Sequence, residues 1–379
     1  MKTIVKAFIL VYLTFFIISC QKNQSGSEFE IKRGVNLSHW LSQDFGWEPK
    51  YQFIQEKDIK FIDSIGYDHV RIPIDEFEFW DENNQPIEEA FKHLESCLNW
   101  CNKYGLKAIV DLHVLRSHHF NAQNEGKKNS LWDDVNEQNH FIKLWQLLSD
   151  RLKKFPNNLV AYELLNEAVA PSADILNNLF SRVLDSIRKL EPERTIIIGA
   201  NMWQTVNNVP LMKIPENDKN IIISFHFYTP LLFTHYTANW TPLQYFKGEV
   251  HYPGMVISDE DLKNYLDTAR VEVKNMIEDV KQPFNKERLY EMIKPAIEFA
   301  KSKKVRLYCG EFGCLPTVPR KDRLQYYSDL IDIFEENNIA WANWEYKGDF
   351  GIYFFDNKKL KSLDPDFEFI DTLLKYTKK

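Results

Sequence analysis

The chain has 379 residues, of which 47 are Lys or Arg and 54 are Asp or Glu, so its formal net charge is −7. A mildly acidic chain has no electrostatic reason to bind a polyanion, and we therefore expect no nucleic-acid partner. With 44% hydrophobic and 27% charged residues the composition is globular, which excludes a disordered or collagen-like protein.

The N-terminus has the features of an export signal. Lys2 and Lys6 precede an apolar run from Ala7 to Ile18, which is shorter than the roughly 20 residues of a membrane-spanning helix. The run ends in Ile-Ile-Ser-Cys, which resembles the signal of bacterial lipoproteins, where cleavage leaves the cysteine first in the chain and carrying acyl chains.

This resemblance implies that residues 1–20 are a lipoprotein signal peptide ending at a lipidated Cys20; an ordinary buried cysteine is the alternative. Residues 21–29 are predicted to form a flexible tether, and residues 30–379 a single domain. No other apolar run is long enough to span a bilayer. We therefore expect an exported protein that contacts a bacterial membrane only through its lipid anchor. The outer membrane is favoured, and the sequence does not decide whether the protein lies on its periplasmic face or on its outer face.

Four further cysteines lie within the predicted domain. Cys97 and Cys101 fall on the apolar stripe of a predicted helix and are expected to pack in the core. Cys309 and Cys314 bracket a Gly-Glu-Phe-Gly turn, and an exported protein permits a disulfide between them, which the sequence leaves open. A four-thiolate zinc site is the alternative, but the usual C-x₂-C spacing is missing.

Eight short apolar segments are predicted to be strands: Arg33–Leu37, His69–Ile74, Lys107–Leu112, Val160–Leu165, Thr195–Ile198, Ile221–Phe227, Val305–Cys309 and Ala340–Trp344. Amphipathic segments between them are predicted to be helices, among them Glu56–Ile65 ended by Gly66, Glu88–Tyr104 ended by Gly105, Phe141–Phe155 ended by Pro156, and Ala173–Leu190. Several of the strands are apolar on both faces, which indicates a parallel sheet covered by helices.

Eight such units in about 350 residues predict an α/β fold, a (β/α)₈ TIM barrel in a single domain. A doubly wound open sheet is the alternative, but the first strand lacks the GxGxxG loop of dinucleotide-binding folds. A long insertion separates strands six and seven, with predicted helices at Asp259–Val280 and Lys286–Lys303. Its aromatic side chains either line a cleft or pack the loop against the barrel; they are Phe233, His235, Tyr236, Trp240, Tyr245 and Tyr252.

Polar residues gather where the predicted strands end, which is the edge of a barrel that forms active sites. Glu167 follows the fourth strand and Glu311 follows the seventh, so their carboxylates can face each other across the mouth. Two carboxyl groups about 5–5.5 Å apart suit double displacement at a sugar, because one attacks the anomeric carbon while the other protonates the departing oxygen.

The two roles need opposite protonation states at one pH. Arg71 is the cation expected to keep the attacking carboxylate ionised, and Tyr228 is expected to donate a hydrogen bond to it. His113 and His226 would hold the acid or bind sugar hydroxyls.

Four motifs resemble those of glycoside hydrolase family 5: Val-Arg-Ile-Pro at 70–73, Leu-Asn-Glu at 165–167, His-Phe-Tyr at 226–228 and Gly-Glu-Phe-Gly at 310–313. The resemblance spans the chain from about Arg33 to Tyr353. It implies a retaining β-glycosidase that needs no metal or other cofactor, with Glu167 as acid/base and Glu311 as nucleophile. By the same resemblance the remaining site residues are Asn166 at the sugar 2-hydroxyl, Trp344 as the platform beneath the sugar, Trp40 as a second stacking ring, and Arg71, Tyr228, His113 and His226 around the carboxylates.

Three positions depart from the family pattern. Ala168 stands where a proline is common and leaves the chemistry unchanged. Arg116 either meets an acidic sugar or pairs with a neighbouring Asp, and pairing is favoured. Glu345 adds a carboxylate beside the platform.

The resemblance favours an endo-β-1,4-glucanase acting as a monomer on oligo- or polysaccharide. The alternatives are a β-mannanase, a β-1,3-glucanase or an exo-acting enzyme of the same fold. A metal-dependent hydrolase is a further alternative, built on His39, His113, His118 and His119. A surface glycan-binding protein without turnover is the non-enzymatic alternative, although a binder has no need for both glutamates.

Overall fold

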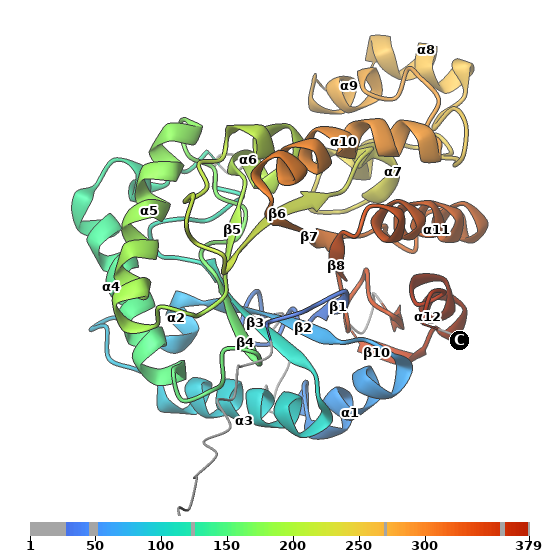
Figure 1. Cartoon of the computed structure of the whole chain (residues 1–379). Coiled ribbons are helices and arrows are strands. Elements are labelled where there is room, and N and C mark those ends of the chain that lie inside the picture. Colours follow the sequence, from blue (N-terminus) through green and yellow to red (C-terminus); the bar gives the residue numbers. More distant parts are fainter. Residues whose placement is uncertain (1–27, 45–51, 123–125, 269–270, 357–360, 378–379) are drawn as a thin grey trace, which may run out of the picture.

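The computed structural model describes residues 28–44, 52–122, 126–268, 271–356 and 361–377. At its centre eight parallel strands close into a barrel in the order β1 to β8 (Figure 1). The strands are β1 Arg33–Asn36, β2 His69–Asp75, β3 Lys107–Val114, β4 Val160–Glu163, β5 Ile196–Gly199, β6 Ile221–Phe227, β7 Arg306–Phe312 and β8 Ala340–Asn343. The predicted (β/α)₈ barrel is confirmed, and no strand edge of this barrel is left unpaired.

Helices surround the barrel (Figure 1). The long ones are α1 Glu56–Ile65, α3 Glu88–Tyr104, α4 Val135–Leu152, α5 Ala173–Leu190, α10 Lys286–Lys303 and α11 Arg320–Glu336, and α12 Phe367–Leu373 is shorter. Gly66 and Gly105 end α1 and α3 in the left-handed conformation, with φ of 105° and 79°, as their places in the sequence predicted. The apolar face of α3 buries Cys97 and Cys101, which confirms their predicted core role.

Other parts of the fold differ from the prediction. Helix α4 begins at Val135, six residues before its predicted start, because Asp134 caps a first turn that carries no apolar periodicity. Between β5 and β6 there is no long helix, only α6 Asn201–Gln204 and the 3₁₀ segment η3 Val206–Leu211. The sequence analysis also did not predict α2 Glu76–Phe79, the 3₁₀ segment η2 Ser130–Trp132, or the hairpin of β9 Tyr353–Asp356 and β10 Lys361–Pro365.

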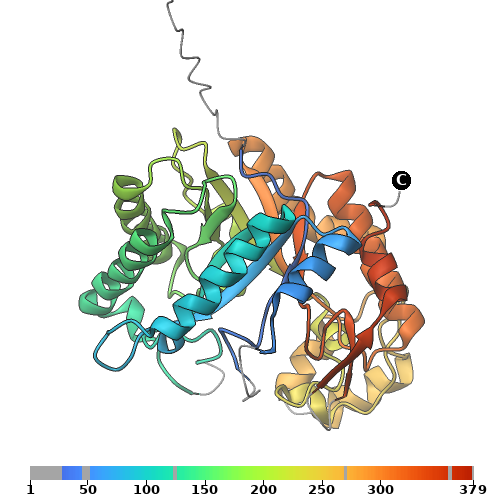
Figure 2. The same ribbon diagram turned by 90° about the horizontal axis from the view of Figure 1, so that it is seen from below.

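The segment between β6 and α10 holds α7 Leu231–Thr234, η4 Pro242–Tyr245, α8 Asp259–Thr268 and α9 Val271–Glu278. The single helix predicted over 259–280 is therefore described as two helices. In Figure 2 this segment, in yellow and light orange, and the β9–β10 hairpin lie at one end of the barrel, and the first described residues, in blue, lie at the other.

The end of the barrel where the described chain starts is closed by Phe29. Its buried ring packs with one inward layer of strand residues, which are Ile109, Ala161, Ile197, Ile222, Tyr308 and Ala342. The carboxyl ends of the strands therefore open at the opposite end, beside the segment that joins β6 to α10. Within the described residues, no helix combines the length and the apolar character needed to cross a bilayer. Cys20 and residues 21–27 of the predicted tether lie outside the described residues.

Candidate active site

The carboxyl ends of the strands bring the two predicted glutamates together. One oxygen each of Glu167 and Glu311 and one ring nitrogen of His226 lie within 4.8 Å of one another. The Nδ1 atom of His226 is 2.9 Å from Glu167 Oε1 and 3.6 Å from Glu311 Oε2. The side chains of Glu167 and Glu311 are 13% and 6% exposed, so both are largely enclosed but reachable from the mouth. This spacing is compatible with the roughly 5–5.5 Å between the carboxyl groups of retaining glycosidases.

Glu311 is held from two sides. Arg71 Nη1 donates to Oε1 at 2.8 Å, and the Tyr228 hydroxyl donates to Oε2 at 2.9 Å. Both contacts were expected from the sequence. Because each oxygen has a charged or polar donor, the ionised form of Glu311 is stabilised and its orientation is set.

Arg71 is fully buried and serves more than one carboxylate. Its Nε donates to Glu163 at 2.6 Å and its Nη2 lies 3.0 Å from Asp111. Nη2 also donates to the amide oxygen of Asn166 at 2.9 Å. One positive charge therefore faces three buried carboxylates, and burial raises the pKa of Asp111 to about 7. Near neutral pH, Asp111 is therefore close to its pKa, and a proton on Asp111 lowers the negative charge that faces Arg71.

The environments of Glu167 and Glu311 differ in a way that separates their protonation. Burial and the negative charge of Glu311 raise the pKa of Glu167 well above its ordinary value. Burial also raises the pKa of Glu311, but the Arg71 guanidinium and the Tyr228 hydrogen bond act against that rise. The proton that the pair retains therefore resides on Glu167, while Glu311 is the better anion.

The predicted histidines and platform complete the wall of the site. Burial lowers the pKa of His113 to about 4 and that of His226 well below its ordinary value, so both imidazoles are neutral. His113 Nδ1 lies 2.7 Å from Asp111, which sets its orientation. Its ring is nearly parallel to that of Trp344, at 12° and with centroids 5.7 Å apart. Trp344 is thus placed beside the site residue His113, but it is only 8% exposed, and its role as a platform for the sugar stays a prediction.

Trp40 is a correction to the predicted site. Its side chain is 1% exposed and belongs to the main core, where its ring lies 6.4 Å from that of His93. A buried ring has no face left for a sugar, so we remove Trp40 from the site. Sequence position alone misled here, because a Trp just beyond a strand end points either into the mouth or under the surrounding helices.

Arg116 forms an ion pair, as favoured, but with a Glu and not an Asp. Its Nη1 lies 2.7 Å from Glu76 Oε1, and its Nη2 donates to the carbonyl of Asp81. Glu345 is fully buried and lies 2.9 Å from His39 Nε2, so it is not available to a substrate. Cys309 and Cys314 are both free and buried, which answers the open question of a disulfide.

The alternative metal centre does not assemble. In the described part of the chain, the groups of three potential metal ligands within 4.8 Å are His39 with Glu345 and Asp349, and Glu167 with His226 and Glu311. His118 lies elsewhere, where its Nε2 accepts the backbone N–H of Val169 at 3.2 Å. The four histidines of the metal hypothesis are therefore not brought together as one ligand set.

Two residues that position the site were missed by sequence reasoning. Glu163 lies within β4 and binds Arg71, and Gln204 lies at the end of α6 and binds both Glu163 and the backbone of Glu167. A carboxylate within the otherwise apolar Val-Ala-Tyr-Glu strand was a signal for Glu163. Nothing in the sequence near Gln204 marks it.

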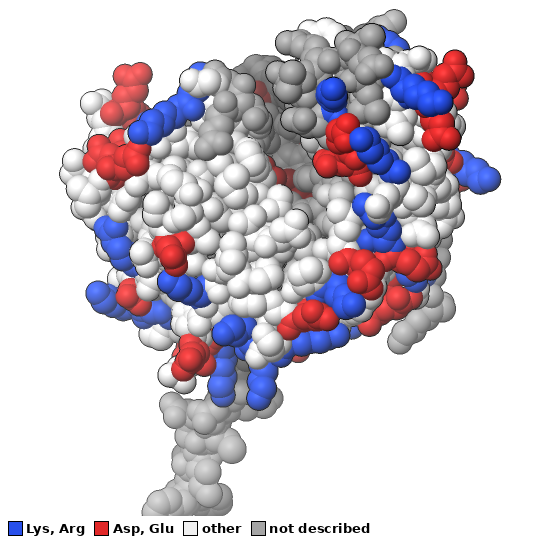
Figure 3. Space-filling model, turned by 90° about the horizontal axis from the view of Figure 1, so that it is seen from above, with Lys and Arg blue, Asp and Glu red and all other residues white. Residues whose placement is uncertain are grey.

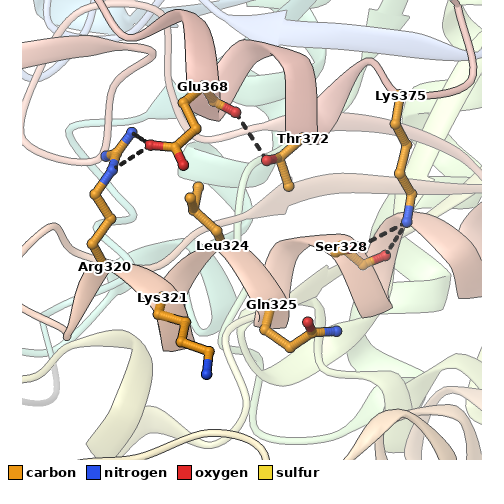
Figure 4. A pocket seen from close by; sticks show the side chains of 8 residues that line it. All are labelled: Arg320, Lys321, Leu324, Gln325, Ser328, Glu368, Thr372 and Lys375. Carbon is orange, nitrogen blue, oxygen red and sulfur yellow. Dashed lines mark hydrogen bonds and ion pairs between the residues drawn. The ribbon is translucent and has the colours of Figure 1, made fainter.

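A pocket of about 510 Å³ lies away from these residues, between α11 and α12 (Figure 4). Its lining residues are Arg320, Lys321, Leu324, Gln325, Ser328, Glu368, Thr372 and Lys375. Arg320 is paired with Glu368 and Lys375 with Ser328, so these cations are already satisfied. On the face in Figure 3, basic and acidic side chains are interspersed, and no broad basic surface is visible that would suit a polyanion.

The chain is similar to known proteins of one family. Residues 23–349 match the family described as Cellulase (glycosyl hydrolase family 5). Endoglucanase C of Acetivibrio thermocellus is 35% identical over 335 residues, covering 86% of this chain and 94% of the relative. Cellodextrinase A of Ruminococcus flavefaciens is 30% identical over 313 residues, covering 82% and 84%.

Solved structures share the fold at lower identity. Endoglucanase Cel5A of Thermotoga maritima in complex with mannotriose has a TM-score of 0.68 and 23% identity, with 90% of this chain and 97% of that chain covered. A crystal structure described as a glycoside hydrolase has a TM-score of 0.73 at 23% identity, with 91% and 99% covered. With the match to the family over most of its length, this chain is an enzyme of glycosyl hydrolase family 5, an endoglucanase-like glycosidase.

Proposed function

We propose that this protein hydrolyses internal β-1,4 linkages of glucans by double displacement, with retention at the anomeric carbon. The observation that carries the proposal is the asymmetric pair of carboxylates at one point, of which only Glu311 contacts the Arg71 guanidinium. Such a pair supplies one acid and one nucleophile at the same pH. The names of its relatives, endoglucanase C and cellodextrinase A, support a glucan as the substrate.

In the first step Glu311 attacks the anomeric carbon, and the bond from that carbon to the leaving oxygen breaks. Glu167 transfers its proton to the leaving oxygen, so the departing sugar leaves as a neutral alcohol and Glu311 becomes a glycosyl ester. In the second step Glu167 takes a proton from a water molecule, whose oxygen attacks the same carbon and releases Glu311. The two inversions leave the product in the β configuration.

We assign the roles of the other site residues from the contacts that they make. Arg71 and Tyr228 hold Glu311 in its ionised form. Asn166, held by Arg71, is placed to bind the 2-hydroxyl beside the reacting carbon. His113 and His226 are neutral hydrogen-bonding groups at the walls, and the Trp344 ring, which stacks on His113, is assigned to the apolar side of a pyranose.

The purified protein is expected to release soluble cello-oligosaccharides from carboxymethyl-cellulose and barley β-glucan, with the viscosity falling faster than reducing ends appear. Internal cleavage shortens chains before it makes many ends. NMR during early turnover should show the β anomer first. Mannan, laminarin and xylan serve as controls. Faster hydrolysis of one of these would contradict the proposed β-1,4-glucan and identify that polysaccharide as the substrate. Binding without release of reducing ends from any glycan would favour the non-catalytic alternative.

We also propose that the protein is anchored through a lipidated Cys20 and acts at a bacterial membrane surface. The sequence features of residues 1–20 support this placement. Phe29 closes the barrel at the end opposite the carboxyl ends of the strands. An anchor attached on that side would leave the mouth of the site facing away from the membrane.

Cys20→Ser is expected to move the exported protein from the membrane fraction to the soluble fraction, with turnover per mole of enzyme unchanged. Each buried CH₂ of an acyl chain contributes about 0.8 kcal/mol to membrane binding, so removing all chains releases the protein. Detergent phase partitioning measures this. Ser19→Ala, which keeps the cysteine, is the control and should remain in the membrane fraction. A Cys20→Ser protein that still partitions with the membrane would contradict the anchor.

A further inference from the structure

The loop that carries Glu167 has an unusual backbone. Glu167 has a φ of 44°, in the left-handed region that residues with a side chain rarely enter. Such a conformation persists only where surrounding contacts hold it. The backbone N–H of Glu167 donates to the side-chain oxygen of Gln204 at 2.8 Å. One residue further along, the carbonyl of Ala168 accepts the backbone N–H of Trp203 at 3.3 Å.

Gln204 is fully buried and its amide has a defined orientation. The Nε2 group donates to Ser224 Oγ at 2.9 Å and to Glu163 Oε1 at 3.2 Å. Both of these partners suit the NH₂ end of the amide, so the oxygen end must face the N–H of Glu167. The side chain passes so close to Gly199 that a Cβ there would lie 2.6 Å from Gln204 Cδ.

The backbone of Gln204 is also constrained. Met202, Trp203 and Gln204 have φ values of 53°, 58° and 53°, three successive residues in the left-handed region. A segment that keeps this conformation next to a reaction centre is over-determined by its contacts. Gln204 therefore presents its amide from a rigid support.

These contacts connect the two glutamates through the protein. Glu311 accepts from Arg71, Arg71 donates to Glu163, Glu163 accepts from Gln204, and Gln204 accepts from the backbone of Glu167. Every side chain between the two ends of this series is buried. The backbone of Glu167 is thus connected, through Gln204 and Glu163, to the same guanidinium that binds Glu311.

We propose that Gln204 is a positioning residue for proton transfer, whose amide oxygen holds the backbone of Glu167 so that the carboxyl group reaches the leaving oxygen. Gln204 itself does not touch the substrate. This inference rests on the proposed function, in which Glu167 is the acid. It predicts a defect that depends on how much protonation the leaving group needs.

The test compares Gln204→Met, which keeps the length of the side chain and removes the acceptor, with the wild-type enzyme. For a cello-oligosaccharide we expect kcat to fall by about ten- to a hundredfold with KM within about twofold, because misplacing a general acid forfeits part of its 10²–10⁴-fold contribution. For dinitrophenyl β-cellobioside, whose leaving group needs little protonation, kcat/KM should fall by less than about threefold, because this ratio reports only the first displacement, whereas kcat also contains the second step, in which Glu167 acts as the base. Gln204→Glu retains an acceptor oxygen and should recover most of the lost rate at a pH where the new carboxyl group is protonated.

Asn201→Ala is the matched control. Asn201 makes two hydrogen bonds to the backbone of Ala170 in the same loop but none to Glu167. Asn201→Ala should lower the melting temperature about as much as Gln204→Met does, but it should change the rates on the two substrates by the same factor. Equal losses on both substrates for Gln204→Met, or no recovery in Gln204→Glu, would show that Gln204 only supports the fold. Glu167→Gln tests the role of Glu167 as the acid separately from the role of Gln204. This variant should itself lose more activity on the cello-oligosaccharide than on dinitrophenyl β-cellobioside. If it loses both activities equally, Glu167 is not the acid, regardless of the result for Gln204.

Discussion

Glu311→Ala should lower kcat/KM for a cello-oligosaccharide by about 10⁴-fold or more, because removing a residue that acts in the covalent step costs losses of this order. Oligosaccharide affinity should remain close to that of the wild type, since Trp344, His113 and Asn166 stay in place. Titration calorimetry and initial rates measure the two quantities separately. An intact affinity with no turnover would match a nucleophile, whereas loss of both would match a binding residue.

A small anion supplies the positive evidence for this role. Alanine leaves space beside Arg71 and Tyr228, both of which lose their contact with Glu311. Azide bound there should attack dinitrophenyl β-cellobioside and form the α-glycosyl azide, because only one displacement then occurs. Glu335→Ala, which removes a carboxylate paired with Arg33 outside the site, is the control and should keep full activity. A β-configured azide product would overturn the assignment.

Arg71→Met is expected to lower the free energy of unfolding by about 3–5 kcal/mol at pH 8, because it leaves buried carboxylates without their cation. The carboxylates in direct contact are Asp111, Glu163 and Glu311. Burial already raises the pKa of Asp111 to about 7 with the guanidinium present, and without it all three pKa values should rise further. Glu311 would then be protonated at neutral pH, and hydrolysis should be lost together with stability.

The stability deficit should depend on pH with a defined sign. In the unfolded chain the pKa values of these carboxyl groups are near 4, whereas in the folded variant burial raises them with no guanidinium to oppose the rise, so the folded state binds the protons more tightly. The deficit relative to wild type should therefore be largest above pH 8 and shrink as the pH falls toward 5, where protonated carboxyl groups need no cation. Urea unfolding at pH 5 and pH 8 measures it. An equal deficit at both pH values would contradict the charge argument.

Arg194→Met is the matched control for Arg71→Met. Arg194 is also buried and paired, with Glu191 at 2.6 Å, but its other hydrogen bonds go to the carbonyls of Phe155, Pro156 and Val160, which are not site residues. Arg194→Met should lower the free energy of unfolding without changing the pH dependence of hydrolysis. If both variants lost activity in proportion to stability, Arg71 would have no separate role at Glu311.

Local patterns were sufficient for much of the fold. Helices α1 and α3 end at the glycines that the sequence marks, because a left-handed turn favours a residue without a side chain. Strands that are apolar on both faces indicated a parallel sheet covered by helices, and the presence of eight such strands alternating with helices indicated a barrel. Helix α4 was predicted short because a polar first turn has no periodicity to detect.

The sequence by itself determined the eight strands and the two glutamates at the ends of the fourth and seventh, since strand periodicity and strand-end position are local properties of the chain. Only the tertiary structure decided that Trp40 is buried, that Glu345 pairs with His39, and that Gln204 reaches the backbone of Glu167. Those outcomes depend on which side chains meet across a closed barrel. They are set by packing and charge compensation between residues far apart in the chain, and no local pattern reports such contacts.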